Sequence, residues 1–160
     1  MKYLLKVILI SCSLFSCLNA KPQGIVNKWV IGYTGGGGQI LIDFNQDSII
    51  SIDTLQWKMN FLDLNASICD SQGNILFYTN GGWIANATND TMQNGNNLTP
   101  GAYANNWKHD GFRNSQGAVI VPFPGDSSKY YLFHETIDLM GNTVIPVSYT
   151  HLTLPTKLEV

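Results

Sequence analysis

The segment Ala66–Gly82, ASICDSQGNILFYTNGG, constrains the fold of this chain more than any other stretch. Two short segments rich in strand-forming residues, Ala66–Asp70 and Ile75–Thr79, flank the turn sequence SQGN. Asp70 stands at the first turn position, where its carboxylate can bond the following backbone, and Gly73 supplies the positive φ of a bulged type I loop. The segment therefore predicts an antiparallel hairpin. Because four successive side chains of its second strand are apolar, both faces of that strand are expected to be covered.

Short apolar segments bounded by turn residues continue on both sides of this hairpin. Four of them are further predicted strands: Trp29–Tyr33, Gln39–Phe44, Ala118–Val121 (expected to be buried) and Lys129–His134. Ser48–Asp53 alternates only loosely between apolar and polar residues. Trp57–Leu64 has no clean period and is compatible with a strand or a loop. Since no segment combines a sustained helical period with helix caps, the pattern indicates an all-β fold.

Asparagine, glycine and threonine crowd the segment Gly82–Gln116, so it is predicted to be mostly surface loop. Aromatic residues interrupt this segment, and their side chains are expected to pack against the rest of the domain and hold the segment in place. The aromatic rings could also stack on sugars, although aromatic residues of a small β-protein more often fill its core. This segment supplies all the candidate binding residues, which are Trp83, Asn94, Tyr103, Trp107 and Asp110.

The N-terminal residues Met1–Ala20 have a short basic start, an apolar run and a small-residue end, as a secretory signal peptide has. Cleavage after Ala20 would release a soluble chain. A lipobox-like sequence ending at Cys17 leaves open a lipid anchor there as the route to a membrane. Either route predicts a protein that is secreted or held on the outer cell surface. Cys69 would then be a lone cysteine, interpreted as a small buried hydrophobic residue.

Charge and motifs exclude several classes of function. Residues 21–146 carry six basic and ten acidic side chains with no basic stripe, which disfavours a nucleic-acid partner. The glycine run at 35–38 lacks the Lys-Ser/Thr and the helix of a phosphate-binding loop, so a hairpin loop is expected. The sequence His134-Glu135 begins like a zinc-protease motif, but Asp138 replaces the second histidine. No catalytic, cofactor-binding or metal-binding residue is therefore assigned.

Six segments, which follow one another along the chain, together resemble a known family: Trp29–Gly32, Ile42–Phe44, Ala66–Gly81, Met92–Gly95, Ser115–Gly125 and Tyr130–Phe133. Over about residues 29–135 the chain resembles the N-terminal β-propeller region of secreted Bacteroidetes proteins. Those proteins carry a C-terminal type IX secretion sorting domain or a gliding-motility-associated C-terminal domain. Asn80 stands where that family more often has aspartate.

The resemblance implies a partial β-propeller of antiparallel hairpins after the signal peptide, with about three blades in residues 21–146. It also implies export through a C-terminal domain that this chain lacks. Residues 147–160 are expected to be non-native, because Val147–Thr156 resembles the translation of a transposase end sequence used to prepare sequencing libraries. Any pairing of that tail is expected to cap an open strand edge.

Two functional hypotheses follow. The first is a non-enzymatic binding or scaffolding module, a fragment of a larger exported protein, whose partner is a surface glycan or a protein. The alternative is a carbohydrate-active propeller enzyme, a glycan hydrolase or lyase, that uses Asp110 or Glu135 with Trp107 as a platform. A glycosidase needs two carboxylates roughly 5–10 Å apart, and the sequence does not show whether Asp110 and Glu135 meet that condition.

Overall fold

The structure is a computed structural model and describes residues 26–32, 38–44, 48–136 and 147–153. Within these residues the chain forms nine strands and one short helix. They are β1 (Lys28–Gly32), β2 (Gln39–Asp43), β3 (Ser51–Leu55), β4 (Ala66–Cys69), β5 (Ile75–Thr79), β6 (Ile84–Asn86), α2 (Ala102–Trp107), β7 (Ala118–Pro122), β8 (Lys129–Glu135) and β9 (Val147–Thr153). The predicted all-β character is confirmed.

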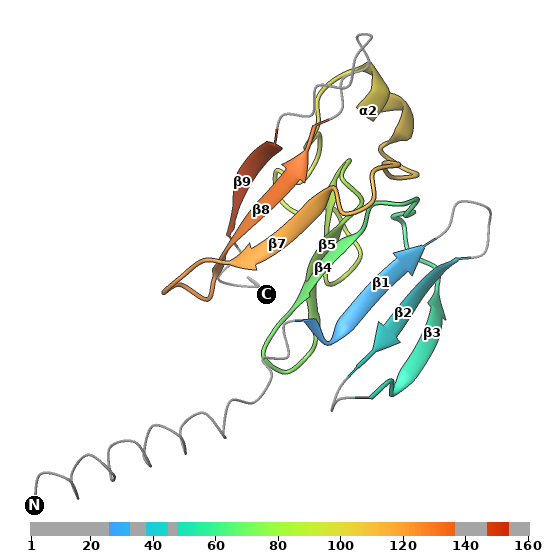
Figure 1. The fold of residues 1–160 in the computed structure, drawn as a ribbon, viewed down its shortest axis with the longest axis vertical. Helices are drawn as coiled ribbons and strands as arrows, with labels where there is room; N and C mark the ends of the chain where they lie inside the picture. The colour runs from blue at the N-terminus through green and yellow to red at the C-terminus, as the bar shows by residue number, and fades with distance from the viewer. Residues whose placement is uncertain (1–25, 33–37, 45–47, 137–146, 154–160) are drawn as a thin grey trace, which may run out of the picture.

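The strands form three antiparallel sheets of three strands each, β1-β2-β3, β4-β5-β6 and β7-β8-β9. Each sheet is a meander, because its strands pair in the order in which they follow along the chain. The first strands lie side by side, β1 next to β4 and β4 next to β7, and the later strands extend away from them (Figure 1). The sheets therefore fan out from a common line of first strands.

The hairpin of β4 and β5 matches its prediction closely. The strands pair antiparallel, with a register shift between Ile68 and Cys69. The Asp70 carboxylate accepts hydrogen bonds from the backbone N–H of Gln72 (2.9 Å) and Asn74 (2.8 Å), and Gly73 has φ +84°. Burial opposes ionisation of this carboxyl, but these hydrogen bonds outweigh that effect and lower the pKa of Asp70. The local turn chemistry thus fixes the register of the hairpin.

The middle sheet is packed on both faces. On one side Tyr78 joins a cluster with Val30 and Phe61 from the first sheet and its following loop. On the other side Phe77 joins a cluster with Tyr130 and Leu132 of the third sheet. Because Phe77 and Tyr78 are successive residues of β5, their side chains point to opposite faces. The prediction that both faces of this strand are covered is confirmed.

Three other expectations need correction or refinement. Trp57–Leu64 is a loop, although Met59, Phe61 and Leu64 within it are fully buried. Ala118–Val121 is a strand but is not buried throughout, because Val119 and Val121 lie on the outward face of the third sheet and are exposed. Gly82–Gln116 holds β6 and α2 as well as loops. The six residues of α2 are too few to produce a recognisable helical period.

Several expectations fall outside the described residues. The predicted signal peptide, with Cys17, and most of the glycine run lie there. Val147–Thr153 pairs with the whole length of β8 as β9 and forms an edge of the third sheet. The structure does not describe its side chains, so the non-native origin of residues 147–160 stays a prediction.

Candidate functional site

Asn80 attaches the segment around α2 to the middle sheet. Its side chain is fully buried, and its Nδ2 donates to the carbonyl oxygens of Asn60 and Lys108, both at 2.9 Å. Its Oδ1 accepts from the backbone N–H of Gly82 (3.0 Å) and Trp83 (3.4 Å). One amide thus joins the end of β5, the loop before β4 and the turn after α2. This anchor holds α2 at a defined place on the surface.

An aromatic surface lies on this anchored helix. Tyr103 is half-buried and packs on the buried ring of Phe112, with ring centroids 5.6 Å apart. Trp107, the last residue of α2, is 36% exposed and lies 6.4 Å from Tyr103 between ring centroids. The guanidinium carbon of Arg113 lies 5.4 Å from the centroid of the Trp107 ring, a cation–π distance. The helix therefore presents two aromatic rings, and the Arg113 guanidinium lies over the ring of Trp107.

A polar group borders this surface. Asp110 is half-buried, its backbone N–H donates to the carbonyl of Trp107 (3.0 Å), and the Asn60 side chain donates to its carboxylate at 3.4 Å. We call Tyr103, Trp107, Asp110 and Arg113 together the α2 surface. Arg113 was not among the sequence candidates, because only the turn after α2 brings its side chain back to Trp107.

The other two predicted binding residues lie elsewhere. Trp83 is 8% exposed and belongs to the core between the first and second sheets, so its ring faces protein rather than solvent. Its indole Nε1–H is buried without a hydrogen-bond partner. Asn94 is exposed in the turn before Gly95, with φ +59°, which asparagine tolerates well. The structure thus brings together three of the five candidates, Tyr103, Trp107 and Asp110.

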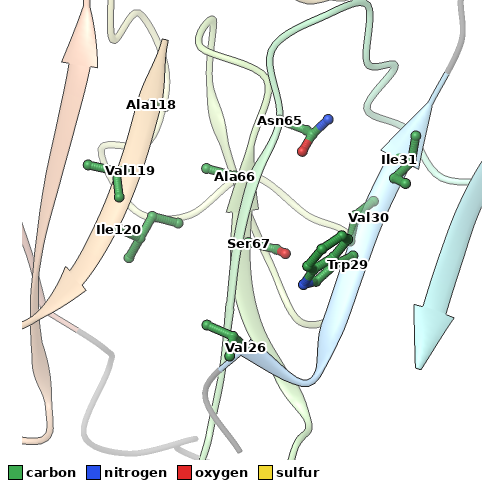
Figure 2. A pocket seen from close by; sticks show the side chains of 10 residues that line it. All are labelled: Val26, Trp29, Val30, Ile31, Asn65, Ala66, Ser67, Ala118, Val119 and Ile120. Atoms are coloured by element: carbon green, nitrogen blue, oxygen red, sulfur yellow. The ribbon is translucent and has the colours of Figure 1, made fainter. Parts of the chain in front are cut away.

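A groove runs along the line of first strands (Figure 2). It has a volume of about 520 Å³ and lies between β1, β4 and β7. Apolar side chains dominate its lining, among them Trp29, Ile31 and Val119, while Ser67 donates a hydrogen bond to the carbonyl of Lys28 at 3.1 Å. The groove offers an apolar surface and few groups that could carry out chemistry.

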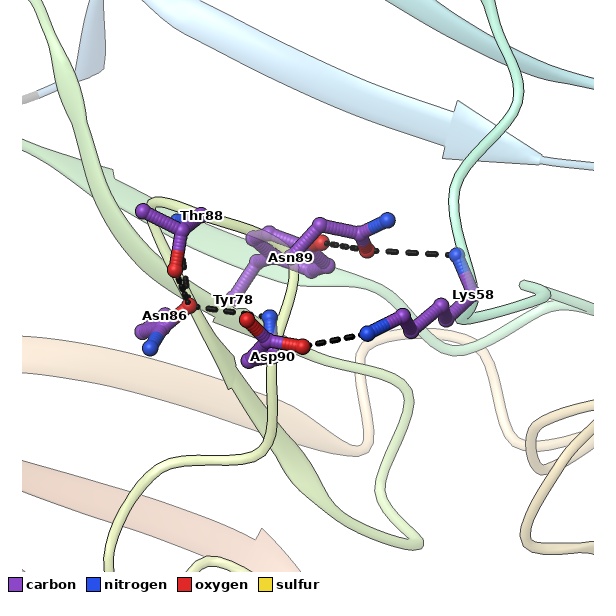
Figure 3. Close-up of polar contacts among 6 residues, drawn as sticks. All are labelled: Lys58, Tyr78, Asn86, Thr88, Asn89 and Asp90. Carbon is purple, nitrogen blue, oxygen red and sulfur yellow. Dashed lines mark hydrogen bonds and ion pairs between the residues drawn. The ribbon is translucent and has the colours of Figure 1, made fainter.

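The Asn-rich loop after β6 forms a polar cluster that is structural (Figure 3). The Tyr78 hydroxyl donates to Asn89 Oδ1 at 2.5 Å, and Lys58 forms an ion pair with Asp90. Burial, followed by the nearby carboxylate of Asp90, raises the pKa of Tyr78. Asn86 Oδ1 accepts from the backbone N–H of Asp90 at 2.9 Å. These contacts tie the loop after β3 to the loop after β6.

The remaining reactive side chains are placed for packing. Burial raises the pKa of the Cys69 thiol, which keeps it in the less reactive protonated form. Burial also lowers the pKa of His134, an inward-facing residue of β8. Glu135 accepts a hydrogen bond from Asn114 (2.5 Å), whereas Asp110 has Asn60 as its partner. Among the described residues, no three His, Cys, Asp or Glu side chains gather closely enough to hold a metal ion.

No family model, curated protein or solved structure matches this chain. In the part of the chain that the structure describes, no helix is both long and apolar enough to cross a membrane.

Proposed function

We propose that this chain is a non-enzymatic binding or scaffolding module of an exported protein, and that its three sheets are successive blades of a β-propeller. Three features support the propeller: each sheet is an antiparallel meander, the sheets pack face to face, and their first strands are neighbours. The sequence resemblance supports an exported Bacteroidetes protein of the type IX secretion or gliding-motility class. The signal-like residues 1–20 support secretion or display on the outer cell surface.

One observation carries the binding role, namely the exposed ring of Trp107 on a helix that buried contacts hold in place. An exposed aromatic ring with a guanidinium over it suits a sugar ring, which stacks on the indole surface that Arg113 leaves open while its hydroxyls bond polar neighbours such as Asp110. It equally suits an aromatic or acidic side chain of a protein partner. The partner class is therefore a surface glycan or a protein surface, and the contact runs through the α2 surface.

A polysaccharide panel with matched tryptophan variants tests this function. We expect Trp107→Ala to weaken binding at least about tenfold, as the loss of a central aromatic contact does. Trp29→Ala is the matched control, because Trp29 is a second exposed tryptophan, at 54%, that lies in the groove rather than on α2. Unchanged binding by Trp107→Ala would remove the α2 surface as the contact.

The carbohydrate-active alternative is decided in the same panel. In this alternative, Asp110 beside Trp107 is one catalytic carboxylate and Glu135 is the candidate for the second. Product release by the wild-type chain that Asp110→Asn or Glu135→Gln abolishes would overturn the non-enzymatic proposal. Binding without turnover is the expected result.

A further inference from the structure

The positive charges next to α2 differ from the other positive charges of the domain. Of the five lysine and arginine side chains that the structure describes, three form ion pairs with an aspartate. These pairs are Lys28–Asp43, Lys58–Asp90 and Lys129–Asp126. The other two, Lys108 directly after α2 and Arg113 in the turn that follows, pair with no carboxylate in the described part of the chain. The unpaired cations are therefore gathered at the α2 surface.

Arg113 has hydrogen-bonding capacity that the domain does not use. Its side chain is exposed, and its guanidinium lies over the Trp107 ring, 5.4 Å from the ring centroid. Its N–H donors have no hydrogen-bond partner among the described residues. A planar guanidinium with open donors binds a carboxylate through two parallel hydrogen bonds. The α2 surface thus offers an anion a partner directly beside an aromatic ring.

The backbone that carries these side chains is held in place. The Trp107 carbonyl accepts hydrogen bonds from the backbone N–H groups of Asp110 (3.0 Å) and Gly111 (2.9 Å), which closes the turn after α2. A Cβ added at Gly82 would come within 2.7 Å of the Lys108 Cα, so the end of α2 lies directly on this glycine. A surface that is already ordered loses little conformational entropy when a ligand binds.

The mixture of groups on the α2 surface indicates the chemistry of the ligand. The Trp107 indole packs on the C–H face of a sugar ring, and the Asp110 carboxylate accepts hydrogen bonds from hydroxyls. The Arg113 guanidinium binds a carboxylate. A uronic acid carries all three complementary features on one ring. An acidic peptide lacks the neighbouring hydroxyls, and its carboxylates would meet Asp110 as a like charge.

We propose that the ligand of the α2 surface is an acidic polysaccharide built from uronic acid residues. One sugar ring stacks on Trp107, its carboxylate binds the Arg113 guanidinium, and Lys108 adds positive potential close by. This inference rests on the binding role proposed above, and it narrows the partner from glycans and proteins in general to one class of glycan.

Isothermal titration of this chain with polygalacturonate, alginate and hyaluronan tests the requirement for a carboxylate. Each polymer is compared with its methyl ester, which keeps the rings and hydroxyls but carries no carboxylate charge. We expect the chain to bind at least one acidic polymer about tenfold more tightly than its ester. The preference should fade in about 1 M salt, which screens exposed charges. Equal affinity for acid and ester, or binding to none of the three acidic polymers, would overturn the inference.

A pair of charge-removing variants identifies the cation. Arg113→Gln should weaken binding to the acidic polymer about tenfold and leave binding to the ester unchanged, because stacking on Trp107 remains. Lys129→Gln is the matched control. Lys129 also lies over an aromatic ring, 5.9 Å from the centroid of Phe123, but it is paired with Asp126 at 3.0 Å, so both affinities should stay unchanged. Equal losses in the two variants would show a general effect of net charge and refute a site at Arg113.

The same titrations separate failure of this inference from failure of the binding function. Binding to neutral polymers that Trp107→Ala abolishes and Arg113→Gln leaves unchanged would overturn the acidic ligand but keep the α2 surface as the contact. Binding to polyglutamate as tight as that to the best uronate polymer would overturn the choice of a glycan. Binding that Trp107→Ala leaves unchanged would remove the α2 surface as the contact, and with it both proposals.

Discussion

Both polar atoms of the Asn80 side chain form hydrogen bonds that suit their chemistry. Its Nδ2 faces two carbonyl oxygens and its Oδ1 faces two backbone N–H groups, all within a fully buried site. An aspartate at this position could accept from the two N–H groups but could not donate to the two carbonyls when ionised. The amide is therefore the chemically matched residue in this chain.

We accordingly expect Asn80→Asp to lower the free energy of unfolding by about 3 kcal/mol or more at pH 7, because a buried carboxylate would face two unbonded carbonyl oxygens. The loss should shrink in acid, where the protonated carboxyl can donate to one of them. Asn94→Asp, in an exposed turn, is the control and should change little. Urea unfolding at pH 7 and pH 4 measures both, and equal effects of the two substitutions would refute this account.

His134 should make stability depend on pH. Burial lowers its pKa below the ordinary value of 6.5, so on acidification the unfolded chain takes up a proton before the folded chain does. The contribution of His134 to the free energy of unfolding is then fully present above about pH 6.5. It is lost as the pH drops from there to the lower pKa of the folded state, by at most about 1.4 kcal/mol per pH unit. We expect His134→Gln to remove this slope in urea unfolding between pH 7 and 5. His109→Gln, at an exposed position, should retain it.

At the scale of the element, the β4–β5 hairpin supplies the buried side chains through which the middle sheet packs on its two neighbours. Phe77 is fully buried among residues of the second and third sheets and meets Tyr130 edge-on, with ring centroids 5.2 Å apart. We expect Phe77→Ala to lower the free energy of unfolding by about 3–5 kcal/mol, as deletion of a buried aromatic ring does. Phe133→Ala, on the exposed side of β8, should cost much less. Thermal or urea unfolding compares them, and similar losses would contradict the packing described.

At the scale of the whole molecule, the three sheets should differ in local stability. β5 has both faces covered, whereas β3 is the outer strand of a sheet with one exposed face, and three of its five residues are exposed. Regions with few buried contacts open without global unfolding. We expect the amides of Ile75–Thr79 to exchange with deuterium most slowly and those of Ser51–Leu55 much faster. Uniform protection across the two strands would show that the sheets open only together.

Local signals were sufficient for much of this fold. Asp70 and Gly73 predict the hairpin because turn conformation depends on neighbouring residues alone, and the run of apolar residues in β5 predicts its two-sided burial. The short apolar segments predict most of the other strands for the same reason. At the candidate site, the composition of Gly82–Gln116 singled out Tyr103, Trp107 and Asp110, which the structure places next to one another; their role in binding stays a prediction.

The tertiary structure decided what depends on distant partners. Trp83 and Trp107 lie in the same kind of sequence, but the first is covered by the first sheet and its loop, and the second remains at the surface. Val119 lies in an apolar run, yet it is exposed because burial depends on which sheet covers a face. Arg113 reaches Trp107 only through the turn after α2. Local sequence sets the backbone conformation, whereas burial and side-chain neighbours are set by contacts between segments far apart in the chain.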